Sequence, residues 1–572
     1  MKIRNESKWI AYIFLISIVA YGIIISFFTS TVHVGVDEEL YVSLARSFHY
    51  KGNFEYENQI MDYNCVLYSM IISIAYYFYS PQNILFIMRM IGVISMTSAI
   101  FPIYFLAKDI LQDNKKAVLM SGFLMTMPYM FDCAYIMQEV LSYPLFMWTA
   151  FFLYCAFGRN NKENMFHVIT SSIFSVLCVF TKTYMFFIPF VINANSLYDI
   201  ARKENKRKYI LNTVVYDIVY FCFFMGMYFC IFVINGFEKG SNHYASVFSN
   251  LFPISINTVI YGVIGCIIYA AFFAVNTGIF PIGTIICKWL GGDRTWLIRF
   301  LLVSIAFMIP EIVFMIFLAE EGTGTLPHKF YFRYFQIFVP LILILFIKYK
   351  ENTGLGKAHG IQAGMIMSLC ITTLYFFCMQ GKTREGIIDG HLFLFIENIS
   401  KYIVPYADIA IMLLLLAALV FVLWLFRKNE TIQLMNKLVK VGIIGIVFFW
   451  IIETVQLPFY TNVIADGKTI QNDSIKIAQY LNQEKYEHIY YVCDAQNAGS
   501  GYIRNFYGYI IQSYETISEE DMLELFQMQP KESQIAFLAA SEVEIDNNRL
   551  ECISLDTERL ILYVPAETAL EE

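Results

Sequence analysis

The chain has 572 residues, of which 58% are hydrophobic, 17% aromatic and only 15% charged. This composition excludes an ordinary soluble protein, and the net charge of -7 argues against a nucleic-acid-binding surface, which requires a basic patch. Apolar runs of about 17–25 residues recur from Trp9 to Leu457, and each is long enough to cross a bilayer core of about 30 Å. The sequence therefore predicts a polytopic α-helical membrane protein.

The first outer segment follows the first apolar run. Lys2, Arg4 and Lys8 precede that run, and the positive-inside rule places such residues in the cytoplasm. A crossing over 9–29 then brings Asp37, Glu38 and Glu39 to the outer face. Leu40, Leu44 and Phe48 recur at helical spacing behind these carboxylates, and Gly52 is suited to end the helix. We expect a short helix at the membrane surface with its carboxylates at the N-terminal end, where the helix dipole favours anions.

The apolar run 65–79 is too short for a full crossing, because its 15 residues rise only about 22 Å as a helix. Charge decides its placement. If it does not cross, the cytoplasmic segments hold 23 Lys and Arg residues and the outer loops before residue 458 hold 9; if it crosses, this bias reverses. We therefore expect surface or re-entrant helices over about 30–83.

The remaining apolar runs give about thirteen transmembrane helices in total. They are expected near residues 9–29, 84–107, 117–132, 143–158, 165–180, 184–200, 209–235, 259–287, 296–318, 335–347, 361–379, 403–426 and 441–457. The odd number leaves the N-terminus in the cytoplasm and the C-terminus outside, in a multi-pass protein of the cell membrane.

The composition changes after Leu457. Soluble patterns replace the apolar runs, with a helix expected over 474–483 and strands over 488–493, 534–539 and 559–564. The sequence predicts two domains, a transmembrane domain over 1–457 and a small extracytoplasmic α+β domain over 458–572.

Unusual polar residues fall on the same predicted side as Asp37. Glu139 precedes a crossing in the second outer loop, and Lys182 is a lone cation at the outer end of two apolar runs. His328, Arg333 and Tyr334 lie in an aromatic stretch before another crossing. Purely structural explanations also exist. Lys182 can be a lysine that extends its ammonium to the membrane surface, and the aromatic stretch around Arg333 can be an interfacial belt.

Together these residues supply carboxylates for a general base or a cation, two or three positive charges for a phosphate, and an apolar surround. This combination suits transfer chemistry on a lipid phosphate, because a phosphate leaving group needs positive charge and an attacking hydroxyl needs a carboxylate. A Walker-type glycine loop and a GxSxG nucleophile elbow are both absent from the sequence.

The motifs resemble those of GT-C fold glycosyltransferases, in the branch of protein O-mannosyltransferases and lipid A aminoarabinose transferase. Val36-Asp37-Glu38-Glu39-Leu40-Tyr41, followed by Ala45-Arg46, resembles the DE-x-x-Y…A-R signature of the first outer loop. Glu139 resembles the second acidic position, Thr181-Lys182 the T-K segment, and Arg333-Tyr334 followed by Pro340 the R-Y…P segment. The likeness covers about residues 10 to 345.

The resemblance implies an inverting transfer of a sugar from a polyprenyl-phosphate donor to a glycan, lipid or protein acceptor on the outer face. Asp37 would be the base and Glu38 a second catalytic carboxylate; Glu38 and Glu139 would hold a divalent cation (Mg or Mn) or the acceptor. Tyr41, Glu139, Lys182, His328, Arg333 and Tyr334 would bind substrate. One departure is the segment 62–67, Asp-Tyr-Asn-Cys-Val-Leu, where the family often has Lys/His-Pro-Pro-Leu.

Two alternatives stay open at the level of sequence. A transporter or flippase of lipid-linked saccharide would need ionisable residues in mid-membrane, for which Glu311, Asp408 and Glu453 are the candidates. A polysaccharide polymerase or ligase would use the same lipid carrier.

Overall fold

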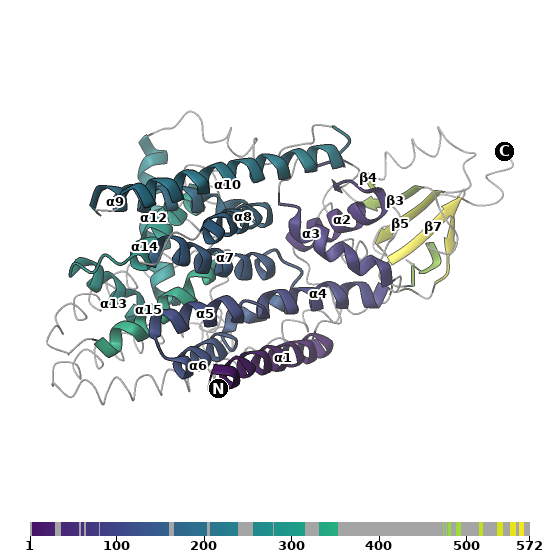
Figure 1. Cartoon of the computed structure of the whole chain (residues 1–572). Coiled ribbons are helices and arrows are strands. Elements are labelled where there is room, and N and C mark those ends of the chain that lie inside the picture. The colour runs from purple at the N-terminus through teal and green to yellow at the C-terminus, as the bar shows by residue number, and fades with distance from the viewer. Residues whose placement is uncertain are drawn as a thin grey trace, which may run out of the picture.

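The computed structural model of the chain is a helical bundle with a small sheet beyond one end (Figure 1). It describes residues 3–28, 36–56, 59–61, 65–78, 81–159, 165–202, 206–237, 256–277, 279–314, 331–352, 473, 476–477, 479–481, 488–493, 514–518, 535–540, 550–555, 557 and 560–565. His328, Asp408 and Glu453, and the crossings expected after residue 360, lie outside these ranges.

The first two long apolar stretches form as expected. Helix α1 (Ile3–Phe28) has 26 residues, which extend about 39 Å and therefore exceed the bilayer core. Helices α4 (Pro81–Thr97) and α5 (Ile100–Leu111) follow one another with a break at residues 98–99. The hydroxyls of Thr97 and Ser98 donate to the carbonyls of Val93 and Ser95, and such bonds often bend helices.

The other long helices pack alongside. They are α6 (Asn114–Leu124), α7 (Glu139–Leu153), α8 (Met165–Thr181), α9 (Phe187–Arg202), α10 (Lys206–Ile234), α12 (Ile256–Thr277), α13 (Ile279–Leu290), α14 (Trp296–Ile312) and α15 (Val339–Asn352). Short 3-10 helices lie between them: η2 (Pro128–Ala134), η4 (Thr183–Phe186), η6 (Phe332–Tyr334) and η7 (Gln336–Phe338). The segment η3 (Tyr154–Gly158) is a π-helix that continues α7.

Five stretches among the described residues are long and apolar enough to cross a membrane. They are Lys8–Ser26, Asn83–Leu111, Glu139–Gly158, Lys206–Ile234 and Ile256–Ala274. The predicted class, a polytopic helical membrane protein, is therefore confirmed, and the total of about thirteen crossings stays a prediction.

Helices α12 and α13 cover most of the crossing expected over 259–287. Pro281 lies in the first turn of α13; because proline has no backbone N–H, it fits the first turn of a helix and disrupts a helix interior.

The first outer segment consists of α2 (Val36–Lys51), a two-stranded ribbon of β1 (Glu55–Tyr56) and β2 (Gln59–Ile60), helix α3 (Leu67–Ile72) and the 3-10 helix η1 (Ser73–Phe78). Gly52 ends α2 at a φ of 74°, and its N–H donates to the carbonyls of Ser47 and Phe48. The end expected for this helix is thus confirmed. The twelve residues of α3 and η1 are too few for a straight crossing.

The C-terminal sheet has the strand order β4-β3-β5-β7-β6. Strands β3 (His488–Cys493), β5 (Ile535–Ala540) and β7 (Leu560–Pro565) match the three expected strands, whereas β4 (Tyr514–Ser518) and β6 (Leu550–Ile553) are additional. Strand β3 is parallel to β4 and β5, and β7 is antiparallel to β5 and β6. The small α+β character of this region is confirmed, and its outer-face location and exact boundary stay predictions.

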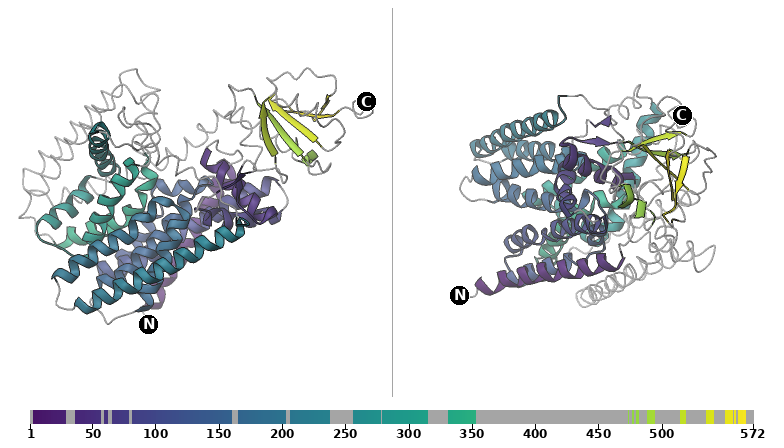
Figure 2. Two further views of the ribbon diagram at one scale, coloured as in Figure 1. Left: turned by 90° about the horizontal axis from the view of Figure 1, so that it is seen from above. Right: turned by 90° about the vertical axis from the view of Figure 1, so that its right-hand side faces the viewer.

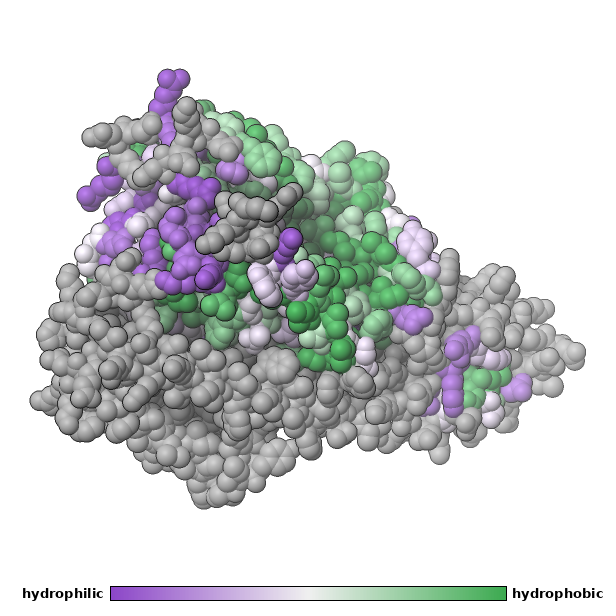
Figure 3. Space-filling view, turned by 60° about the horizontal axis from the view of Figure 1, so that its bottom comes forward, coloured by the Kyte–Doolittle hydropathy of each residue, from purple (hydrophilic) through white to green (hydrophobic). Residues whose placement is uncertain are grey.

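The bundle has two distinct ends. Helix α8 packs against α7 and α10, and the helices run side by side in both views of Figure 2. The basic end holds Lys108, Arg159, Arg202 and Lys348, near the ends of α5, η3, α9 and α15. The opposite end, called the Glu139 end, holds the start of α7, the end of α8 and helices α2, α3 and η6. In Figure 3 hydrophilic residues gather toward the left of the view and hydrophobic residues cover its centre.

Candidate active site

Glu139 is the buried centre of the Glu139 end. It is the first residue of α7, with only 1% of its surface exposed. The preceding residue, Gln138, is fully buried, and its side-chain amide donates to the carbonyl of Cys65 at 2.7 Å. The start of α7 is therefore tied to the segment before α3, which fixes where the Glu139 carboxylate lies.

Two cations converge on this carboxylate. Lys182 Nζ lies 3.0 Å and Arg333 Nε lies 3.3 Å from Glu139 Oε1. Lys182 follows α8 in an extended conformation, and Arg333 is in η6. The three residues lie far apart in the sequence, so the fold itself brings the predicted acidic and basic motifs to one point. We call these residues the Glu139 triad.

Tyrosine rings surround the cations of the triad. The guanidinium carbon of Arg333 lies 4.5 Å from the ring centre of Tyr331 and 5.6 Å from that of Tyr334. Lys182 Nζ lies 5.7 Å from the ring of Tyr334, which packs edge-on against Tyr184 at 4.9 Å. These rings stabilise the positive charges and orient them without neutralising them.

Among the described residues, the triad holds two cations and one carboxylate, and one oxygen of that carboxylate is unsatisfied. Two cations face one carboxylate, and Oε2 of Glu139 is buried without a hydrogen-bond partner among the described residues. A buried acceptor left unpaired costs about 1–3 kcal/mol, and more when it is charged. Such a cost is typical of a site that a ligand completes, and the charge balance favours an anionic ligand.

Glu38 is the second buried carboxylate, in the first turn of α2 and 3% exposed. Its Oε1 accepts a hydrogen bond from the backbone N–H of Ile136 at 3.1 Å. Burial raises the pKa of Tyr68 well above its ordinary value, Glu38 adds to the shift, Arg89 opposes it and Glu139 adds to it. Because Coulomb effects fall with distance, these three charged residues lie near Tyr68.

Arg89 is a site residue that the sequence interpretation missed. It lies in α4 and is only 2% exposed. The signal was present, since an arginine inside an apolar span is by default a candidate functional residue. Gln138 and Tyr184 were also overlooked, because amides and tyrosines are common in outer loops and at membrane interfaces.

The other predicted residues lie as follows. Asp37 is in the first turn of α2, beside Glu38, and its side chain lies outside the description. Tyr41 is 3% exposed and packs edge-on against Tyr68, with ring centres 6.0 Å apart. Cys65 stands in the segment that departs from the family pattern, and its thiol lies 3.2 Å from the hydroxyl of Thr183, next to Lys182. His328 is outside the described residues.

A metal site is not supported by the described side chains. They contain no group of three His, Cys, Asp or Glu residues arranged to hold an ion. Glu139 is paired with two cations and Glu38 accepts a backbone N–H, whereas magnesium and manganese need several free oxygen ligands. The predicted binding of a divalent cation by Glu38 and Glu139 therefore stays a prediction, and no step below depends on it.

The architecture is that of the GT-C fold, a polytopic bundle with a cluster of buried acidic and basic residues at one end. The similar solved structures include ArnT from Cupriavidus metallidurans bound to undecaprenyl phosphate, with a TM-score of 0.54 and 12% identity over 98% of this chain and 99% of that chain. ArnT in the apo state gives a TM-score of 0.53 at 12% identity over the same shares. The Archaeoglobus fulgidus oligosaccharyltransferase AglB, in complex with an inhibitory peptide and a dolichol-phosphate, has a TM-score of 0.42 and 12% identity over 93% of this chain and 69% of that chain.

These comparisons establish the fold. The GT-C fold expected from the outer-loop motifs is confirmed by the likeness to ArnT over nearly the whole length of both chains. No model of a known protein family matches the sequence, and a search of curated proteins found no match either.

Proposed function

We propose that the chain is an integral-membrane glycosyltransferase that moves a sugar from a polyprenyl-phosphate donor to an acceptor hydroxyl or amine on the outer face. The Glu139 triad is the observation that carries this proposal. Two cations with tyrosine rings around them meet a buried carboxylate there, which suits a lipid phosphate next to a sugar ring. The GT-C fold shared with ArnT, solved with undecaprenyl phosphate, supports the same donor class.

The reaction would be a single displacement with inversion at the anomeric carbon. The acceptor oxygen or nitrogen forms a bond to that carbon, the bond from carbon to the phosphate oxygen breaks, and the acceptor proton passes to Asp37. Lys182 and Arg333 stabilise the charge that develops on the departing phosphate. Tyr334 and His328 would contact the donor, and Tyr41 would hold the first turn of α2 in place.

Glu38 would position the acceptor rather than take its proton. Its hydrogen bond with the Ile136 N–H and its burial hold it in one orientation. Asp37, at the N-terminal end of α2, benefits from the helix dipole as an anion and is the better candidate for the base.

The test is transfer of a radiolabelled sugar from polyprenyl-phosphate donors in membranes that contain the full-length protein. We expect Asp37→Asn to lose about 100-fold or more of the transfer rate, as for removal of a general base. Glu39→Gln is the matched control, because it removes a carboxylate two positions along the same helix, and it should retain the rate. Undiminished turnover in Asp37→Asn would contradict the proposed base.

The same assay separates the alternatives. Passage of intact lipid-linked saccharide across sealed vesicles without bond cleavage would show a flippase. A product that lengthens with time, rather than gaining one sugar, would show a polymerase.

A further inference from the structure

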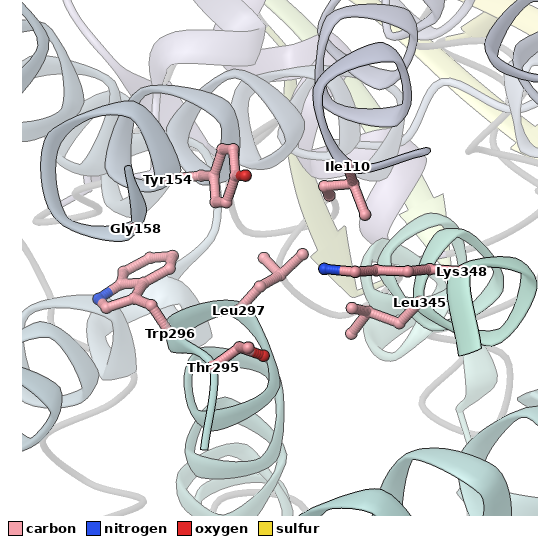
Figure 4. A pocket seen from close by; sticks show the side chains of 8 residues that line it. All are labelled: Ile110, Tyr154, Gly158, Thr295, Trp296, Leu297, Leu345 and Lys348. Atoms are coloured by element: carbon pink, nitrogen blue, oxygen red, sulfur yellow. The ribbon is translucent and has the colours of Figure 1, made fainter. Parts of the chain in front are cut away.

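A cavity of about 180 Å³ lies at the basic end, opposite to the Glu139 triad. It is enclosed by the C-terminal parts of α5, η3 and α15 and by the start of α14 (Figure 4). Typical sites for whole small molecules measure about 300–1,000 Å³. This cavity is therefore large enough for a compact polar group and too small for a complete amphiphile or nucleotide.

The cavity has a cation and no carboxylate in its lining. Figure 4 shows the ammonium group of Lys348 pointing into the space, with the hydroxyls of Tyr154 and Thr295 on other walls. Among the described residues Lys348 forms no ion pair, and its ammonium lies 5.8 Å from the ring centre of Tyr349. The Tyr154 hydroxyl bonds Asp109, and the Thr295 hydroxyl lies 3.4 Å from that of Tyr349. The ammonium group is therefore the donor in this cavity that is suited to phosphate oxygens.

The acidic residues near the cavity are engaged elsewhere. Asp109 pairs with Arg159, at 2.8 Å to Nε and 2.7 Å to an Nη nitrogen. Asp293 precedes α14 and accepts the N–H of Thr295 at 3.2 Å. Among the described residues, then, no carboxylate forms an ion pair with Lys348.

The backbone around the cavity has an unusual form that supports a binding role. Tyr154 and Gly158 belong to the π-helix η3, and single π-helical turns are frequent at functional sites. A Cβ atom on Gly158 would lie 2.6 Å from a ring carbon of Tyr154 and 3.4 Å from one of Trp296. Only glycine at this position lets the Tyr154 ring occupy its place on the cavity wall.

The other walls are apolar. Ile110, Leu297 and Leu345 line the cavity together with the ring of Trp296. The ammonium group of Lys348 can bind the polar headgroup of a phospholipid, and the apolar walls can contact its apolar part. Basic pockets between transmembrane helices commonly bind anionic headgroups.

We propose that this cavity, the Lys348 pocket, binds the phosphate group of an anionic phospholipid from the leaflet at the basic end. Lys348 contributes the charge, Tyr154 and Thr295 form polar parts of the wall, and the acyl chains remain outside the cavity. This site is separate from the proposed transfer reaction, and its occupancy is measured without an activity assay.

The test compares phosphatidylglycerol with phosphatidylcholine of the same acyl chains, bound to full-length protein in detergent and counted by native mass spectrometry. We expect phosphatidylglycerol to bind about tenfold more tightly, which corresponds to about 1.4 kcal/mol. Lys348→Met should abolish the preference. Lys108→Met is the matched control, because Lys108 is at the same end outside the lining, and should retain it.

A second variant keeps the charge and changes the shape. Gly158→Ala displaces the Tyr154 ring and should also weaken the preference, while the melting temperature of each variant reports its folding. An unchanged preference in folded Lys348→Met would overturn the proposal. Inorganic phosphate forms the second arm: if it binds as tightly as phosphatidylglycerol and loses its affinity in Lys348→Met, the ligand is a soluble phosphate and the lipid assignment is overturned.

Discussion

Two groups of buried charges, one at each end of the bundle, are built differently. At the Glu139 end, Lys182 and Arg333 share one carboxylate oxygen, and the other oxygen has no hydrogen-bond partner among the described residues. Toward the basic end, the guanidinium of Arg299 in α14 makes hydrogen bonds of 2.7 and 2.8 Å to both oxygens of Asp199 in α9. Arg299 also lies 4.3 Å from the ring centre of Tyr198.

This comparison distinguishes an ion pair that only stabilises the fold from charged residues that bind a ligand. In the Asp199–Arg299 pair one positive charge meets one negative charge, because a single guanidinium nitrogen, Nη2, bonds both carboxylate oxygens. The charges of the pair therefore balance, although Nε and Nη1 of Arg299 are buried without a hydrogen-bond partner among the described residues. In the Glu139 triad, two cations face one carboxylate among the described residues, so an anionic ligand can complete it. The predictions below test whether this distinction holds.

The largest expected effect is on stability at the balanced pair. Asp199→Asn leaves the Arg299 guanidinium, 5% exposed, without its carboxylate. Removing one partner of a buried pair lowers the free energy of unfolding by about 3–5 kcal/mol. Chemical unfolding of the purified protein in detergent measures this change, and the transfer rate per folded molecule should remain unchanged.

A double variant is the control for this change. Asp199→Leu combined with Arg299→Met removes both charges, and such replacements are commonly neutral or stabilising by about 1–4 kcal/mol. If Asp199→Asn retained its stability and lost transfer activity, the Asp199–Arg299 pair would belong to the catalytic machinery. The proposed difference between this pair and the Glu139 triad would then be wrong.

The next effect is on transfer at the unbalanced triad. Lys182→Met removes one of the charges assigned to the departing phosphate, and we expect kcat/KM to fall about 100–1,000-fold, or about 2.7–4 kcal/mol. Stability should fall less than in Asp199→Asn, because Arg333 remains paired with Glu139. Labelled-sugar transfer together with unfolding of the same preparations provides both numbers.

Lys288→Met is the matched control for Lys182→Met. Lys288 also lies over a tyrosine ring, 5.5 Å from that of Tyr349, but it is at the basic end. An equal loss of transfer in both variants would mean that the effect is general and not specific to the triad.

The smallest effect is a pH dependence at an exposed helix start. Asp113 caps α6, and hydrogen bonds from the backbone N–H groups of Lys116 and Lys115 lower the pKa of its carboxyl below the ordinary value of 3.8. Because the pKa of Asp113 is lower in the folded protein than in the unfolded chain, its ionised carboxyl stabilises the folded state at pH values above the ordinary pKa. This stabilisation is lost as the pH falls through the folded-state pKa. The melting-temperature difference between the native protein and Asp113→Ala should therefore shrink in acid.

Asp113→Asn is the control for that experiment. Asparagine caps a helix without a titrating group, so this variant should keep most of the stability at neutral pH. If the melting-temperature difference between the native protein and Asp113→Ala grew as the pH falls, the direction assigned to the pKa shift of Asp113 would be wrong.

Much of the fold could be predicted from local patterns. Long apolar runs give helices, and the alternation around residues 488–493 gives β3, because both signals depend on neighbours in the sequence. Strands β4 and β6 were missed, since Tyr514–Ser518 and Leu550–Ile553 have mixed composition and depend on pairing with β3 and β7. The pairing of Arg299 with Asp199 could not be predicted from local patterns, because the two residues are 100 positions apart in the sequence.

The sequence by itself determined the membrane class, the approximate places of many of the described helices, and the identity of the acidic and basic residues expected to meet on one side. Hydrophobic length and helical periodicity are local properties, and the positive-inside bias orders the loops. The tertiary structure decided which charges share a site. Distances between Glu139, Lys182 and Arg333, and the burial that gives their unbalanced charge its strength, follow only from the packing of α7, α8 and η6.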